Sequence, residues 1–122
     1  MSRTIKYIAD KKIVEVIVRG RINFGTAQNY SVEAIKVARE NNCSRFLIDH
    51  SKTELFEGIQ RIYTDGAVLE QFGFQVTDKI AIVIESKNNH ALLTDAAANN
   101  IKWSNFRYFN SVTKAVEWLL KK

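Results

Sequence analysis

The run Ile80-Ala81-Ile82-Val83-Ile84 contains no polar residue, and it is the longest stretch of strong hydrophobic residues in the 122-residue chain. It is far shorter than a membrane span, which needs about 20 such residues. A short apolar run rich in β-branched residues is typical of a strand covered on both faces, as in the middle of a parallel sheet. We therefore expect residues 80–84 to form a central strand of an α/β domain.

Two segments near the N-terminus predict an antiparallel hairpin. Residues 4–8 and 13–19 each alternate with a period of two, and a polar turn separates them. The period then changes, because apolar residues recur at helical spacing between Thr26, the expected cap, and Asn41-Asn42, the expected stop. A helix is thus expected to follow the hairpin.

The rest of the chain continues this alternation of strands and helices. Phe46-Leu47-Ile48 is expected as a buried strand that ends at Asp49, and Glu54 favours the start of a helix there. The expected elements, from that strand onward, are residues 46–48, 54–72, 80–84, 91–101, 105–109 and 112–119. The predicted order is ββαβαβαβα, a mixed and mostly parallel five-stranded sheet with four helices, in which only the first strand runs antiparallel to the rest.

The composition is that of one folded domain over residues 1–122. Apolar residues make up 46% and charged residues 25% of the chain, close to the averages for globular proteins. Cys43 is the only cysteine, and residues 1–6 lack the apolar core of a secretory signal. We expect a cytoplasmic protein without a transmembrane segment.

The net charge of +5 is concentrated in residues 1–21, which hold six basic and two acidic side chains. One interpretation is a basic face for an anionic partner. The other is an edge strand, where Lys and Arg discourage pairing with other chains. We favour the edge strand and expect no specific binding of nucleic acid, because no aromatic residues interleave with the charges and no recognition-helix pattern occurs.

Signatures of common enzyme sites are missing from the sequence. It contains no GxGxxG or phosphate-binding loop, and no HExxH or CxxC spacing for a metal. His50 and His90 are expected at solvated or capping positions, and Cys43 is expected as a buried, inert thiol. We expect no catalytic residue, no metal and no cofactor.

Asp49-His50-Ser51-Lys52-Thr53 is the segment most suggestive of a site, since ligands of open α/β sheets bind beyond the carboxyl ends of strands. In one interpretation the hydroxyl of Ser51 or Thr53 lies near a helix N-terminus that stabilises an anion. In the other, one of these hydroxyls caps the helix and Asp49 binds loop amides. Asp49, Ser51 and Thr53 are the candidate regulatory or partner-binding residues.

Four aromatic residues suggest a second kind of site. They lie near the start of the first expected helix or along the second: Phe24, Tyr30, Phe56 and Tyr63. They could line an apolar cleft between these two helices, or they could simply belong to the core, which is the commoner fate of aromatic stripes.

The element order, the apolar third strand that ends in aspartate, and the closing segments Asn105-Phe106-Arg107-Tyr108-Phe109-Asn110 and Ala115-Val116-Glu117-Trp118-Leu119 resemble the STAS domain, specifically stand-alone SpoIIAA-like proteins. In the anti-sigma-factor antagonists of that family, an Asp-Ser-Ser-Gly-like motif after the third strand carries a phosphorylated serine. Here Ser51 and Thr53 follow Asp49 without a Ser-Ser-Gly.

The resemblance implies a non-enzymatic binding or regulatory module that acts through the loop after the third strand and the second helix. Some SpoIIAA-like proteins are similar in fold to CRAL-TRIO lipid carriers, which implies an alternative: a small carrier or sensor of an apolar or lipid-like ligand held between the first two helices. The expected partner is accordingly a protein or a small apolar ligand. The oligomeric state stays open, with a homodimer among the options.

Overall fold

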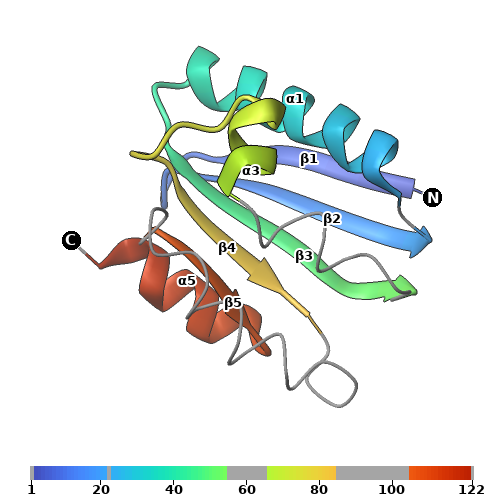
Figure 1. Ribbon diagram of the computed structural model, residues 1–122. Coiled ribbons are helices and arrows are strands. Elements are labelled where there is room, and N and C mark those ends of the chain that lie inside the picture. Colours follow the sequence, from blue (N-terminus) through green and yellow to red (C-terminus); the bar gives the residue numbers. More distant parts are fainter. Residues whose placement is uncertain (1, 22, 55–65, 85–104, 122) are drawn as a thin grey trace.

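The computed structural model describes residues 2–21, 23–54, 66–84 and 105–121 of the chain. These residues form a five-stranded sheet with helices on both faces (Figure 1). Helices α1 (Phe24–Glu40) and α3 (Gly66–Phe72) cover one face, and α5 (Val112–Leu120) covers the other. The α/β class and the mixed sheet expected from the sequence are confirmed.

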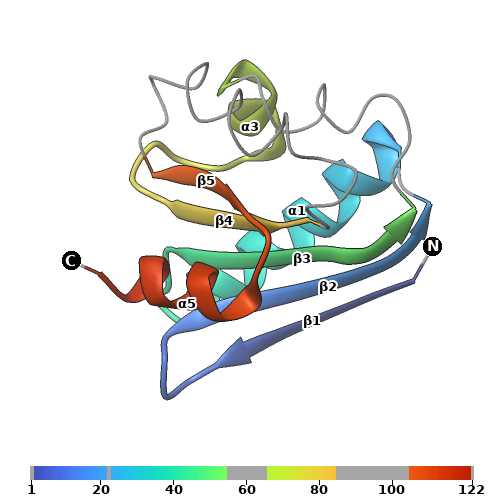
Figure 2. The ribbon, with the colours of Figure 1, turned by 90° about the horizontal axis from the view of Figure 1, so that it is seen from below.

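The sheet follows the chain, with its strands in the order β1-β2-β3-β4-β5 (Figure 2). β1 pairs antiparallel with β2, and every later pair is parallel, so the expected hairpin is confirmed. The strands are β1 (Ser2–Ile8), β2 (Ile13–Arg21), β3 (Arg45–Glu54), β4 (Lys79–Val83) and β5 (Phe106–Phe109). The helix expected over 91–101 and most of the one expected over 54–72 lie outside the described residues.

Helix α1 begins earlier than the sequence predicts. Asn23, not Thr26, is the N-cap, and its side-chain oxygen accepts a hydrogen bond of 2.9 Å from the Thr26 amide. The Thr26 hydroxyl in turn accepts one of 3.0 Å from the Asn23 amide. Asparagine is at least as good an N-cap as threonine, and the reciprocal bonds place Thr26 at the third helical position. Asn41 ends the helix as expected.

Two apolar layers enclose the sheet. On one face, α1 turns small residues and one tyrosine toward the strands, and all of them are fully buried: Ala27, Tyr30, Ala34 and Ala38. On the other face, Ala115 and Leu119 of α5 pack against residues of the inner strands, namely Ile13, Leu47, Ala81 and Val83. β4 is buried on both faces, which confirms the predicted central strand over residues 80–83, and Ile84 directly follows it.

A substitution of Val83 tests whether β4 is a buried strand, because the Val83 side chain is only 2% exposed and packs under α5. Val83→Ala is expected to lower the free energy of unfolding by about 1–3 kcal/mol, through lost apolar burial and the cavity that remains. Urea denaturation measures this change. Val76→Ala is the matched control, since Val76 is 51% exposed and its truncation should stay within about 0.5 kcal/mol. Equal effects of the two variants would contradict the buried strand.

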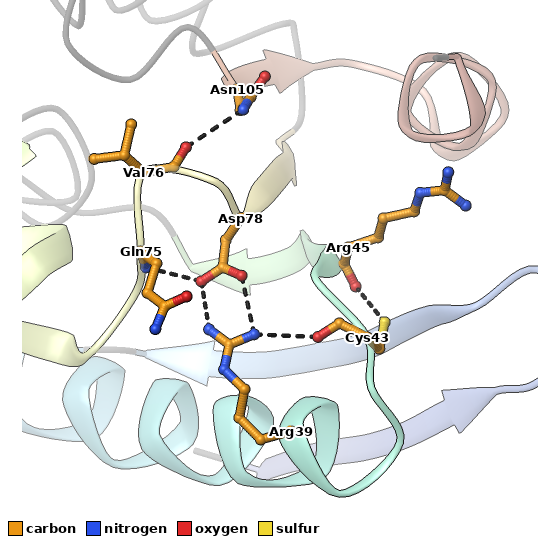
Figure 3. Close-up of polar contacts among 7 residues, drawn as sticks. All are labelled: Arg39, Cys43, Arg45, Gln75, Val76, Asp78 and Asn105. Atoms are coloured by element: carbon orange, nitrogen blue, oxygen red, sulfur yellow. Dashed lines mark hydrogen bonds and ion pairs between the residues drawn. The ribbon is translucent and has the colours of Figure 1, made fainter.

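A polar cluster joins the elements at the amino ends of β3, β4 and β5 (Figure 3). Arg39, near the end of α1, donates two hydrogen bonds of 2.7 and 3.0 Å to the carboxylate of Asp78, which is fully buried just before β4. Arg39 also donates to the Cys43 carbonyl at 3.1 Å, and the Gln75 amide donates to Asp78 at 2.8 Å. This arrangement fixes the end of α1 to the turn that leads into β4.

Helix α5 is fastened at the same edge of the sheet. Ser111 is its N-cap and accepts a hydrogen bond from the Lys114 amide. At the other end, the Lys79 ammonium lies 4.6 Å from the centre of the Trp118 ring and donates to the carbonyls of Trp118 and Lys121. A cation suits the negative end of a helix. The amino edge is therefore held by several polar contacts.

Candidate functional site

The carboxyl half of β3 differs from its expected form. The sequence predicts that this strand ends at Asp49 and that residues 49–53 form a loop, but β3 continues to Glu54. Its last residues pair with the end of β2, with Lys52 opposite Arg19 and Glu54 opposite Arg21. Pairing with this long neighbouring strand outweighs the weak preference of acidic residues for a helix start. The expectation that a helix begins at Glu54 is therefore wrong.

β3 contains a bulge at the candidate residues. Ile17 of β2 lies opposite Asp49, yet Arg19 lies opposite Lys52, so β3 holds one more residue than β2 over this interval. A bulge leaves a backbone amide without its ladder partner. The Asp49 carboxylate accepts a hydrogen bond of 2.8 Å from the Ser51 amide. Asp49 thus binds a neighbouring backbone amide, as one interpretation predicted, although it does so within a strand.

The candidate hydroxyls belong to this extended strand. Ser51 and Lys52 are exposed, and the backbone of Thr53 pairs with Gly20 of β2. Neither Ser51 nor Thr53 adjoins a helix start at Glu54, so the proposed stabilisation of an anion by that helix end has no basis there. The bulge instead presents Ser51 and Lys52 at the carboxyl edge of the parallel strands.

His50 is fully buried, which overturns the expectation of a solvated or capping position. Its Nε2 atom lies 3.1 Å from the hydroxyl of Tyr30, which is also fully buried on α1. Burial lowers the pKa of His50 to about 4, and the nearby Asp49 carboxylate opposes this shift only in part. The imidazole is therefore neutral at pH 7. Its Nε2 atom and the tyrosine hydroxyl form one hydrogen bond, in which the histidine tautomer decides which of the two donates.

Tyr108 of β5 adds a third polar group to this layer of the core. Burial raises the pKa of Tyr108, and the pKa of Tyr30 is raised by burial and by the neighbouring Tyr108. Within the part of the chain that the structure describes, neither the Tyr108 hydroxyl nor that of the buried Ser31 has a hydrogen-bond partner. Most buried polar groups do have a partner. We call Tyr30, His50 and Tyr108 the buried polar cluster.

The sequence predicts a binding role for one member of this cluster. Tyr30 is among the predicted pocket residues, whereas Tyr108 is predicted only as part of a strand. The burial of the Tyr108 hydroxyl was detectable, because Tyr108 lies two residues after the apolar Phe106 and therefore on the same face of the strand. The burial of His50 was also detectable, since it follows Phe46 and Ile48 at the period of a strand and so lies on the face that α1 covers.

The other predicted pocket residues are described in part or not at all. Phe24 begins α1, and only its backbone is described. Phe56 and Tyr63 lie outside the described residues, so the cleft expected between the first two helices stays a prediction. Tyr30 points into the layer between α1 and the sheet, where it contacts His50 with ring centres 5.9 Å apart.

Over the described ranges, no cluster of three or more His, Cys, Asp or Glu side chains is arranged to hold a metal ion. Among the described helices, none is both long and apolar enough to cross a membrane. Cys43 is buried, and its thiol lies 3.1 Å from the Lys12 carbonyl. The sequence matches no model of a known protein family, and it matches no curated protein.

Proposed function

We propose that this chain is a STAS-like, SpoIIAA-type module of four helices and five strands that acts by binding a protein partner and not by catalysis. The mixed sheet with an antiparallel first strand, covered by helices on both faces, supports this proposal. The binding surface that we propose is the carboxyl end of β3, with Asp49, Ser51 and Thr53 as the residues that form it.

The bulge in β3 is the observation on which this surface rests. Bulges change the direction of side chains and are frequent beside functional sites. Here the bulge lies at the edge where open α/β sheets bind their ligands, and Asp49 holds its backbone through the Ser51 amide. Ser51 of this surface and the neighbouring Lys52 are exposed, while polar contacts hold the opposite edge of the sheet.

Native mass spectrometry of the protein purified from its own host tests this function. A co-purifying protein is expected, together with an unliganded mass for the chain itself. Ser51→Asp should abolish the complex while the free energy of unfolding changes by no more than about 1 kcal/mol. Ser44→Asp is the matched control, because Ser44 is exposed just before β3, at the other edge of the sheet. A complex that survives Ser51→Asp unchanged would contradict the proposed surface.

The buried polar cluster favours a second candidate, a carrier or sensor of an apolar ligand that bears one polar group. The Tyr108 hydroxyl is the specific observation, because a buried hydroxyl without a partner among the described residues is suited to bind a polar atom of such a ligand. The same mass spectrum would then contain a bound small molecule.

Tyr108→Phe separates a ligand-binding hydroxyl from a hydroxyl that is only buried. If the hydroxyl contacts a ligand, the bound fraction in the spectrum should fall while the protein stays folded. If it contacts none, its removal should leave the spectrum unchanged and leave stability equal or higher, because an unsatisfied polar group is costly to bury. Phe106→Leu alters the neighbouring ring without removing a hydroxyl and is the control for packing.

A further inference from the structure

A groove runs between α1 and the outer strand of the sheet. β1 is the first strand in the sheet order, so one side of its backbone lacks a partner among the described strands (Figure 2). The groove has a volume of about 820 Å³, and Ile5 and Val37 supply its apolar lining. Charges of both signs surround them: Arg3 and Lys36 are basic, and Glu33 and Glu40 are acidic.

We propose that this edge binds a second copy of the chain, with β1 antiparallel to β1 about a two-fold axis perpendicular to the sheet. The two sheets would then join into one of ten strands. A two-fold contact requires a surface that complements itself. An equal number of basic and acidic side chains around a small apolar centre meets that requirement.

Two of the basic side chains expected to discourage pairing lie on β1, and each forms an ion pair within its own chain, Arg3 with Glu33 and Lys6 with Glu15. These pairs offset the charges that would oppose a second strand, and the sequence of β1 then selects the register. The perpendicular axis keeps each side chain on its own face, so it must pass midway between the two copies of one residue of the strand. An axis at Ile5 pairs all seven residues, places Arg3 opposite Tyr7, and places Lys6 opposite Thr4. An axis at Lys6 or at Arg3 would instead put two like charges directly opposite each other, which is destabilising.

The same register brings the two α1 helices together. α1 packs on both β1 and β2, and strands lie about 4.8 Å apart, so the two helix axes would be about 10 Å apart across the dimer axis. Arg3 is bound to Glu33 in its own chain at 2.7 Å. Because Arg3 already occupies Glu33, the acidic side chain that remains for Lys36 is Glu40 of the second copy. Positions 36 and 40 are about one helical turn apart on α1, so the antiparallel helices can place them opposite each other.

Sedimentation equilibrium over a concentration series tests the proposal. The expected species has twice the 14.0 kDa of the chain. Lys36→Glu and Glu40→Lys should each raise the dissociation constant at least about tenfold, and an equimolar mixture of the two variants should associate again, because each then meets an opposite charge. Lys114→Glu makes the same charge change on α5 and should leave the dimer intact. A chain that stays monomeric at every concentration would overturn the proposal.

Cross-linking tests the register. Cys43 is buried, so a cysteine introduced on β1 is the reactive thiol. Ile5→Cys should form a covalent dimer under mild oxidation, because the two copies of residue 5 face each other. Arg3→Cys should not, since the Cα atoms of its two copies would lie about 14 Å apart. A dimer that is insensitive to both charge changes, and that fails to cross-link at residue 5, would place the interface elsewhere and refute the proposal.

Discussion

Replacing Arg39 with alanine is expected to lower the free energy of unfolding by about 3 kcal/mol. The change leaves the fully buried Asp78 carboxylate without its cation, and removing one partner of a buried ion pair costs about 3–5 kcal/mol. We expect the lower end of that range because the Arg39 side chain is 37% exposed. Chemical denaturation of the purified variant measures the change.

A double-mutant cycle isolates the interaction between these two residues. Asp78→Ala removes the buried charge together with its bond to the Gln75 amide, so it should also destabilise the protein. The double variant should be less destabilised than the sum of the two single variants, since the unpaired carboxylate is then gone. Arg107→Ala removes an exposed arginine and is the control. Additive effects of the two single changes would show that the ion pair contributes nothing specific.

The stability of the protein is expected to fall by about 3 kcal/mol between pH 6.5 and pH 4, through His50 alone. The pKa of His50 is about 4 in the folded protein and near 6.5 in the unfolded chain, so the unfolded chain binds more protons in this interval. Protonation therefore favours unfolding as the pH falls through it. Above about pH 7.5 the imidazole is neutral in both states, and the effect disappears.

His50→Asn separates this effect from the titration of carboxylates. The amide keeps a polar group near Tyr30 but takes up no proton, so the difference in stability between the two proteins should change with pH only over this interval. Thermal denaturation at a series of pH values provides the measurement. Parallel stability curves for the two proteins across pH 4 to 7 would mean that His50 is not buried in its neutral form.

The sheet was predictable because its signal is local. Alternation in residues 4–8 and 13–19 indicates a hairpin, and the unbroken run at 80–84 indicates a buried strand, whichever residues lie opposite. The length of β3 was not predictable in this way. Its last residues are strand because β2 continues beside them, and a sequence does not reveal how far a neighbour extends.

The candidate site was harder to predict for a related reason. Asp49 and Ser51 are close in sequence, and their contact could be anticipated as a carboxylate bound to a nearby amide. The pairing of Tyr30 with His50 and that of Arg39 with Asp78 join residues 20 and 39 positions apart. Such contacts depend on how α1 lies over the sheet, so composition and spacing alone do not supply them.

The antiparallel direction of β1 determines where an affinity tag can be attached without harm. Ser2 lies opposite Arg19, which lies opposite Lys52, so the N-terminus is two strands, about 10 Å, from the proposed binding surface. The C-terminus leaves from the other edge, where Lys121 contacts the first residue of β4 (Figure 1). A fusion at the C-terminus therefore leaves the surface around Ser51 accessible to a partner, whereas an N-terminal fusion would compete for the same space.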